Sequence, residues 1–312
     1  MKHSLIILGS GPAGLTAALY AARSSLRPLV VSGPLPGGLL TQTSGVENYP
    51  GFQEPVNGFE LTENMRVQAE KAGAVFLEGT AAKAELSRGG GLHKVILGDG
   101  TELICDALII ATGAAPRWLG LESEQRLRGH GVSACALCDG PFFRNAPVCI
   151  AGGGDSACEE ALYLSRFARE VHLIHRRRGF RAAAVMLARV EAEPKIRIHT
   201  PYAVEEILGN DRVTGVRLIH AESGESLELP CSGFFAALGH VPNTGLFQGQ
   251  LEMDEQGYIL LQCRSSRTSV EGVFAAGDVS EPEYRQAVMA AGTGCRAAVD
   301  AFHYLAERHD GR

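Results

Sequence analysis

The sequence predicts an α/β fold with two parallel-sheet domains, of which the first is interrupted by the second. Two segments far apart in the chain are each expected to form a buried strand, a glycine-rich turn and a helix. The length of 312 residues also fits two domains of about 150 residues each. The last apolar strand and its following helix have no glycine-rich turn of this kind, so we expect them to complete the first domain.

The first strand–turn–helix unit begins at the N-terminus. Ser4 to Leu8 is a short apolar run, which is typical of a strand buried on both faces of a parallel sheet. The turn after it, Gly9-Ser10-Gly11-Pro12-Ala13-Gly14, matches the pattern G-x-G-x-x-G. In this pattern Gly9 permits the turn, Gly11 lets a pyrophosphate approach, and Gly14 packs the helix on the sheet. The unit therefore predicts a dinucleotide at the helix N-terminus.

The second unit lies near the middle of the chain. Val148 to Ala151 is again an apolar run, and Gly152-Gly153-Gly154-Asp155-Ser156-Ala157 follows it, with alanine in place of the third glycine. A helix through Leu164 and a strand over 171–174 complete the unit. Both units are therefore expected to be Rossmann-like dinucleotide-binding folds, and two such sites predict two dinucleotides.

The residues after the second unit's second strand indicate which nucleotide it binds. An acidic residue there would bind a ribose hydroxyl, whereas arginines accommodate a 2′-phosphate. This chain has His175, Arg176, Arg177 and Arg181. Because a guanidinium pairs with phosphate through parallel hydrogen bonds, the cluster favours NADPH over NADH. The alternative is a solvated basic loop.

Cys135 and Cys138 form the one closely spaced cysteine pair. Two thiols at this spacing suit a disulfide at a helix start, where the helix dipole lowers a thiol pKa. The alternative is half of a zinc site, but no second CxxC or nearby histidine pair completes four ligands, so no metal is expected. Asp139 is either a proton donor and acceptor for the dithiol or a helix cap. The other six cysteines are interpreted as buried thiols.

Gly277-Asp278 follows an apolar strand near the end of the chain. A carboxylate there can accept a hydrogen bond from a cofactor ribityl hydroxyl, or it can belong to an ordinary turn. We place the domain boundaries near Pro116 and Asn243. Residues 1–115 and 244–312 then form an FAD-binding domain, and residues 116–243 form an inserted NADPH-binding domain that carries the cysteine pair.

The overall composition excludes several other classes of protein. The net charge of −6 gives no general attraction to nucleic acid or anionic lipid. No apolar stretch approaches about 20 residues, so no membrane span is expected, and no secretory signal is recognised. A cytoplasmic protein without nucleic-acid or membrane partners is predicted.

With these residues placed, the chain resembles the bacterial low-molecular-weight NADPH-dependent thioredoxin reductases, which are FAD-containing pyridine nucleotide-disulfide oxidoreductases. The stretches that carry the resemblance are Gly9–Gly14, Val46–Gly51, Ala111–Gly113, Cys135–Gly140, Gly152–Ala157, His175–Arg181, Gly239–Asn243, Gly277–Val279 and Arg285–Ala287. The resemblance implies a homodimer that reduces thioredoxin or a thioredoxin-like protein, and an NADPH domain that rotates between two half-reactions.

The resemblance also implies roles for single residues. Cys138 would lie beside the flavin, Cys135 would attack the substrate disulfide, and Asp139 would act as the acid. The residues expected to contact FAD are Gly9, Gly11, Pro12, Ala13, Gly14, Asn48, Gly113, Gly277, Asp278, Arg285, Gln286 and Ala287. The residues expected to contact NADPH are Gly152, Gly154, Asp155, Ser156, Ala157, His175, Arg176, Arg177 and Arg181.

The chain departs from many members at two positions, where Leu39 replaces a glutamine and Asp155 stands where some have asparagine. Leu39 removes a polar contact on the flavin side, and Asp155 adds negative charge near the expected pyrophosphate.

Two further hypotheses remain open from the sequence. One is an FAD-dependent dithiol/disulfide oxidoreductase that uses a different electron donor or protein partner. The other is a flavoprotein sensor whose redox state controls binding to a partner, with the cysteine pair as the sensing group.

Overall fold

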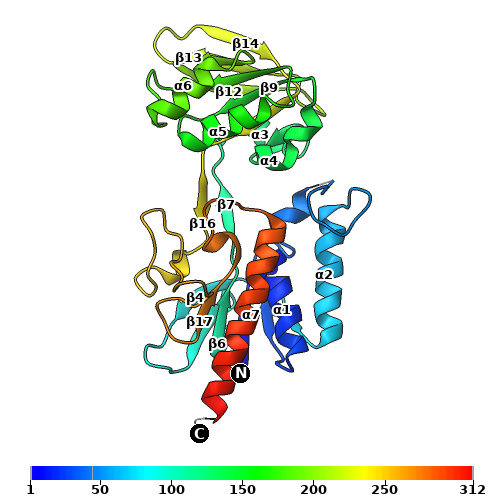
Figure 1. Ribbon diagram of the computed structural model, residues 1–312, viewed down its shortest axis with the longest axis vertical. Helices are drawn as coiled ribbons and strands as arrows, with labels where there is room; N and C mark the ends of the chain where they lie inside the picture. Colours follow the sequence, from blue (N-terminus) through cyan, green and yellow to red (C-terminus); the bar gives the residue numbers. More distant parts are fainter. Residues whose placement is uncertain (1, 44, 311–312) are drawn as a thin grey trace. The chain divides into compact units, whose positions relative to one another are not determined.

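The computed structural model describes residues 2–43 and 45–310, and the chain divides into two compact units. The first unit combines Met1–Ala115 with Val241–Arg312, and the second is Pro116–His240. The chain therefore passes between the units twice (Figure 1). The second passage lies at His240, whereas the sequence analysis placed that boundary at Asn243.

A seven-stranded mixed sheet forms the centre of the first unit. Its order is β3-β2-β1-β6-β5-β4; β5 pairs with the first half of β6, and β17 pairs with the second half. Strands β1, β2, β3, β6 and β17 run parallel, whereas β5 pairs antiparallel with both of its neighbours, β6 and β4. The strands are β1 (Lys2–Leu8), β2 (Leu29–Val31), β3 (Val75–Leu77), β4 (Ala81–Glu85), β5 (His93–Leu97), β6 (Glu102–Ile110) and β17 (Val273–Ala275).

Strand β1 is buried on both faces, as its apolar run predicts. Leu5 and Ile7 pack into a cluster with the alanines of α1 and α7, and Ile6 and Leu8 pack into a separate cluster on the other face. All four are almost completely inaccessible to solvent. Burying one such side chain contributes roughly 1.5–3 kcal/mol. Strand β1 is thus a rigid base for the glycine turn that follows it.

Three helices lie side by side in the first unit, with α1 between α2 and α7 (Figure 1). Their bounds are α1 (Pro12–Arg23), α2 (Gly58–Ala72) and α7 (Ala287–Asp310). Small residues let α7 approach α1 closely, since a Cβ on Gly294 would lie 2.1 Å from the carbonyl oxygen of Ala13. Among the described residues, no helix is long and apolar enough to cross a membrane.

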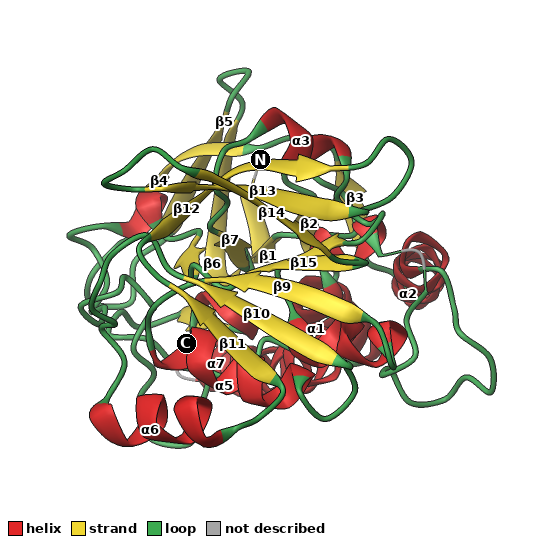
Figure 2. Cartoon of the chain, turned by 90° about the horizontal axis from the view of Figure 1, so that it is seen from above, coloured by secondary structure: helices red, strands yellow, loops and turns green. Residues whose placement is uncertain are grey.

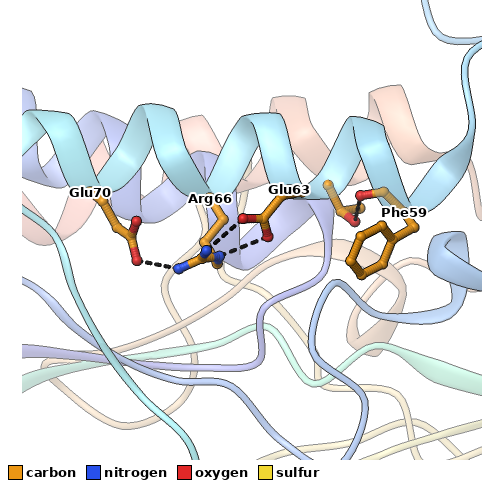
Figure 3. Close-up of polar contacts among 5 residues, drawn as sticks. Phe59, Glu63, Arg66 and Glu70 are labelled. Carbon is orange, nitrogen blue, oxygen red and sulfur yellow. Dashed lines mark hydrogen bonds and ion pairs between the residues drawn. The ribbon is translucent and has the colours of Figure 1, made fainter.

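Helix α2 is stabilised locally at its start and along its exposed side. The Asn57 side chain accepts the N–H of Phe59 at 2.9 Å, which caps the helix. Arg66 bridges Glu63 and Glu70 across adjacent turns (Figure 3). Because these charges are exposed, each pair contributes only about 0.3–0.5 kcal/mol. The packing of α2 against α1 therefore matters more to its position.

The second unit contains a five-stranded parallel sheet of order β11-β10-β9-β15-β8. Figure 2 shows β11, β10, β9 and β15 side by side. The strands are β8 (Val132–Ser133), β9 (Pro147–Ala151), β10 (Glu170–Ile174), β11 (Ile196–His199) and β15 (Gly233–Ala236). The helices of this unit are α3 (Glu122–Arg126), α4 (Ala136–Asp139), α5 (Asp155–Leu164) and α6 (Ala184–Ala192).

The faces of this sheet pack into two separate cores. Phe235 and Ile150 join a cluster with residues of α5, whereas Phe234 and Cys149 join one with the antiparallel sheet β12-β13-β14. The strands of that sheet are β12 (Tyr202–Leu208), β13 (Gly215–His220) and β14 (Ser226–Pro230). The central strands are thus covered on both faces, as expected for a parallel sheet.

A short two-stranded sheet joins the two chain passages between the units. It pairs β7 (Ala114–Pro116) with β16 (His240–Pro242). Within the first unit, Asn243 donates its side-chain amide to the carbonyl of Thr112 at 2.8 Å, and its backbone N–H binds Gly113. Within the second unit, the N–H of Arg117 binds Gly239. The two passages are therefore held together at both ends.

We expect the second unit to lose stability in acid because of a pair of histidines, of which His172 is buried and His199 is partly buried. The Nδ1 of His172 lies 3.0 Å from the Nε2 of His199. Burial lowers the pKa of both rings from 6.5, and that of His199 falls to about 4. In this range the unfolded chain binds protons that the folded chain does not. The free energy of unfolding should therefore be highest above pH 6.5 and fall as the pH decreases toward about 4.

The measurement is thermal unfolding at several pH values, followed by fluorescence of Trp118, the chain's single tryptophan, which packs in the second unit. His199→Gln removes one of the titrating rings and should flatten the dependence. An identical pH dependence in the wild type and this variant would contradict the explanation.

Candidate functional site

The turn between β1 and α1 is shaped by glycines that a larger residue could not replace. Gly9 has a φ of +105°, and a Cβ there would lie 2.3 Å from the carbonyl oxygen of Ala111. A Cβ on Gly14 would lie 1.9 Å from the oxygen of Gly9. At Gly11, the residue before the helix, the nearest atom to a Cβ would be 3.9 Å away. The turn is thus compact inside and open at Gly11, where a phosphate group fits.

Ser10 connects this turn to two other loops at the same edge of the sheet. Its hydroxyl donates to the carbonyl of Ser32 at 2.8 Å and accepts the N–H of Gly37 at 3.1 Å. Ser10 was not predicted as a site residue, because it occupies a variable position of the glycine motif. The loop that contains Leu39 is therefore fixed next to the first glycine turn.

Asp278 is the acidic group that the structure brings to this turn. It follows Gly277, where a Cβ would lie 2.9 Å from the Cβ of Ala13 in α1. Burial raises the pKa of Asp278 to about 6, although the nearby Arg285 guanidinium opposes the shift. A partly buried carboxylate of this kind is well suited to accept a hydrogen bond from a ligand hydroxyl.

The start of α7 brings three more expected residues to the same unit. Arg285 adopts a left-handed φ of +46°, and Ala287 is the first residue of the helix. Asn48 donates its amide to the side-chain oxygen of Gln286 at 3.2 Å, although the two are 238 positions apart in the sequence. At Gly9, Gly14 and Gly277 the chain has no room for a Cβ. Together with these glycines, the polar side chains form a donor and acceptor set that fits FAD.

The second glycine turn lies between β9 and α5. A Cβ on Gly152 would lie 2.5 Å from the carbonyl oxygen of Ala237, and one on Gly153 would lie 2.3 Å from the ring of His175. Nothing lies within 4 Å of such an atom at Gly154, and α5 begins directly after this residue. Gly154 and the first turn of α5, which includes Ser156 and Ala157, can therefore accept a pyrophosphate.

Residues 175–183, which follow β10 and are called the basic segment below, contact this turn. His175 is buried, and its Nε2 lies 3.2 Å from the carbonyl oxygen of Gly179. Burial lowers the pKa of His175, and the neighbouring arginines lower it further. Arg176, Arg177 and Arg181 are exposed. The segment thus combines a buried neutral ring with three exposed cations, an arrangement that fits the 2′-phosphate of NADPH.

Cys135 and Cys138 form a disulfide, with their Cα atoms 5.3 Å apart. Cys135 immediately precedes α4 and Cys138 lies within it, as expected for a pair at a helix start. The backbone N–H of Cys138 donates to the Sγ of Cys135 at 3.2 Å. A thiolate formed at Cys135 after reduction could accept this hydrogen bond, which favours the species that attacks disulfides.

Asp139 and Ser133 flank the disulfide. Burial raises the pKa of Asp139, and a hydrogen bond from the Ser133 side chain opposes the shift. The Ser133 hydroxyl also accepts the N–H of Cys135 at 3.0 Å. Asp139 can therefore hold a proton at a higher pH than an ordinary aspartate. Ser133 was not predicted as a site residue, because a serine two positions before a cysteine has no distinctive pattern.

The surface beside the disulfide carries exposed apolar side chains. Leu137, between the two cysteines, is 49% exposed, and Phe142 is 52% exposed. Such side chains next to a redox-active pair suit contact with a protein substrate.

The prediction that the other six cysteines are buried is wrong for two of them. Cys105, Cys149, Cys158 and Cys231 are buried, but Cys263 is exposed and Cys295 is partly exposed. Cys263 lies outside the helices and strands in a left-handed conformation with a φ of +49°. A single cysteine has no sequence pattern that would show that it lies in an exposed turn.

Comparison with known proteins identifies the family of this arrangement. Residues 3–294 match the family described as pyridine nucleotide-disulphide oxidoreductase. Thioredoxin reductase from Rickettsia conorii is 49% identical over 304 residues, which cover 96% of this chain and 97% of that protein. Thioredoxin reductase from Vibrio cholerae is 49% identical over 314 residues and 98% of both chains.

Solved structures agree with these relatives. The thioredoxin reductase from Streptococcus pyogenes is 38% identical and superposes with a TM-score of 0.93, covering 98% of this chain and 99% of that one.

Proposed function

Because this chain belongs to the pyridine nucleotide-disulphide oxidoreductase family, we propose that it is an NADPH-dependent thioredoxin-disulfide reductase. Electrons pass from NADPH through FAD to the Cys135–Cys138 disulfide, and from the resulting dithiol to thioredoxin or a thioredoxin-like protein. One observation carries the proposal. The same chain has a disulfide at a helix start and two glycine turns, between β1 and α1 and between β9 and α5, that are each open to a pyrophosphate.

The first unit would hold FAD, which when bound would supply hydride acceptance and two-electron transfer to the disulfide. Gly9, Gly11 and Gly14 let the pyrophosphate approach the start of α1, and Asp278 accepts a hydrogen bond from a ribityl hydroxyl. The burial of Asp278 and its position beside α1 support this role. The remaining contacts are assigned to Pro12, Ala13, Asn48, Gly113, Gly277, Arg285, Gln286 and Ala287.

The second unit binds NADPH at the turn between β9 and α5. Gly152 and Gly154 keep the turn open to the pyrophosphate, with Ser156 and Ala157 in the first turn of α5. Arg176, Arg177 and Arg181 pair with the 2′-phosphate, which NADH lacks. The exposure of these three guanidinium groups beside the buried His175 supports the assignment.

The reduced dithiol transfers its two electrons by thiol–disulfide exchange. The Cys135 thiolate attacks one sulfur of the substrate disulfide, which forms a mixed disulfide and releases the other substrate sulfur as a thiolate. Cys138 then attacks the Sγ of Cys135, which releases the second substrate thiolate and re-forms the internal disulfide. Asp139, whose pKa is raised by burial, supplies a proton to a departing sulfur.

The two half-reactions require the second unit to present first the nicotinamide and then the dithiol to one flavin. We assign this change to the paired passages β7 and β16. Gly113 and Gly239 flank them with φ values of +70° and +88°, and a Cβ at either would meet nothing within 4 Å. Glycine tolerates torsion angles that are strained for other residues. The hydrogen bonds that the carbonyls of Gly113 and Gly239 accept would rearrange in this change.

We also propose a cytoplasmic homodimer. Exposed apolar side chains on α7 support an interface on the first unit, namely Val288, Met289, Val299 and Phe302.

The function is tested by adding NADPH, and separately NADH, to the oxidised yellow protein without oxygen, followed by a thioredoxin from the same source. NADPH should bleach the flavin and thioredoxin should restore its colour, whereas NADH should be much less effective. Failure of NADPH to bleach the flavin would contradict the proposed donor, and failure of thioredoxin to restore it would contradict the acceptor. Sedimentation of the same sample should give the mass of two chains, and the mass of one would contradict the dimer.

A further inference from the structure

The carboxylate of Asp155 binds the far end of the basic segment instead of remaining free. Asp155 is the first residue of α5, and its Oδ1 accepts the backbone N–H of Ala183 at 2.9 Å. Ala183 directly precedes α6. The hydrogen bond therefore connects the second glycine turn to the end of the segment that carries Arg176, Arg177 and Arg181.

Further contacts hold the same segment. The backbone N–H of Arg181 donates to the carbonyl oxygen of Gly153 at 2.7 Å. The ring of His175 occupies the space that a Cβ on Gly153 would need, and its Nε2 lies 3.2 Å from the oxygen of Gly179. The rings of His175 and Phe180 also pack at a tilt, with centroids 5.0 Å apart. His175 and Gly153 thus fix the segment at its start and middle, and Asp155 fixes its end.

The position of the arginines depends on this backbone. The side chains of Arg176, Arg177 and Arg181 are exposed, so packing does not restrain them as it restrains a buried side chain. A guanidinium recognises phosphate best when its fork is aligned before binding. A change at either end of the segment would therefore alter the recognition of the 2′-phosphate.

We propose that Asp155 is a positioning residue for cofactor selection. Its carboxylate, through the N–H of Ala183, holds the basic segment where the arginines meet the 2′-phosphate of NADPH. The inference rests on the proposed function of the second unit as the NADPH site. A carboxylate in the first turn of α5 is also favourable to the helix dipole, so its negative charge has a stabilising partner within the protein.

The opposing explanation is electrostatic. If Asp155 acted mainly by repelling the pyrophosphate, its removal would strengthen binding of NADPH and NADH equally, because both contain the pyrophosphate. If Asp155 acted by positioning, its removal would weaken the binding of NADPH selectively. The two explanations therefore predict opposite signs.

The test compares Asp155→Ala, Asp155→Asn and the control Glu159→Ala in the full-length flavoprotein. Glu159 is an exposed carboxylate one turn further along α5. Asp155→Ala should raise the KM for NADPH about fivefold with little change in kcat, and should change the KM for NADH much less. Asparagine keeps an oxygen that can accept the Ala183 N–H, so Asp155→Asn should restore most of the loss. Glu159→Ala should match the wild type.

Calorimetry gives a readout that does not depend on turnover. Adenosine 2′,5′-bisphosphate should bind Asp155→Ala about fivefold more weakly than the wild type, with AMP little affected. Equal loss for both probes, tighter binding of both, or no rescue by asparagine would overturn the inference. If the wild type itself did not prefer the bisphosphate to AMP, the proposed NADPH site would fail instead.

Discussion

Replacing Cys138 by serine should lower thioredoxin reduction about a thousandfold or more, while NADPH still bleaches the flavin. In the proposed reaction, electrons pass from the flavin to the substrate only through the Cys135–Cys138 disulfide. A serine hydroxyl cannot form the disulfide that Cys138 makes with Cys135. No contact that holds either nucleotide is assigned to Cys138, so the first half of the reaction should remain. Steady-state turnover with thioredoxin and rapid-mixing absorbance of the flavin measure the two halves separately.

Cys135→Ser should have the same effect on turnover, because either change leaves one thiol without its partner. Cys263→Ser is the matched control, since Cys263 is an exposed thiol in the first unit that has no role in the relay. It should retain full activity. Substantial thioredoxin reduction by either the Cys135 or the Cys138 variant would show that electrons reach the substrate by another route.

Gly14→Ala should yield a chain that retains little or no flavin, with FAD affinity lowered about a hundredfold or more. The added Cβ would lie 1.9 Å from the carbonyl oxygen of Gly9, so the turn must open or α1 must move. Either change displaces the N–H groups at the start of α1 from the pyrophosphate. Flavin absorbance of the purified protein, and fluorescence titration of the apoprotein with FAD, measure the loss.

Gly292→Ala is the control in the same unit, because Gly292 is exposed on α7 and a Cβ there meets nothing within 4 Å. It should bind FAD normally. Binding of adenosine 2′,5′-bisphosphate by Gly14→Ala would show that the second unit remains folded. Normal flavin content in Gly14→Ala would contradict the role assigned to this turn.

The elements that sequence could predict are those whose signal lies within one short segment. The run Ser4–Leu8 is apolar because β1 is covered on both faces, and its glycine turn follows immediately. Strands β12 and β14 were not predicted, because residues such as Glu205 and Glu228 lie on exposed surfaces. Their pairing depends on neighbours in the folded sheet, which a local pattern does not specify.

In the site, too, motifs within one short segment could be predicted, whereas contacts between residues far apart in the sequence could not. The glycine turns and the Cys135–Cys138 pair have fixed spacings, so their positions could be predicted residue by residue. The contacts of Ser10 with Ser32, of Asn48 with Gln286 and of Asp155 with Ala183 join loops that only the fold brings together. Asp155 illustrates the consequence, since the sequence predicted a contact with NADPH and an unfavourable charge, whereas the structure shows its carboxylate accepting the N–H of Ala183.

The most direct test of the relay is an electron count. Oxidised protein titrated with NADPH in the absence of oxygen should take up about two equivalents per flavin, one for the flavin and one for the disulfide. The double variant Cys135→Ser, Cys138→Ser should take up about one. Alkylation and mass spectrometry should find Cys135 and Cys138 reduced only in the titrated wild type. Equal uptake by the two proteins, with the disulfide still intact at the end point, would contradict electron transfer from NADPH to this cysteine pair.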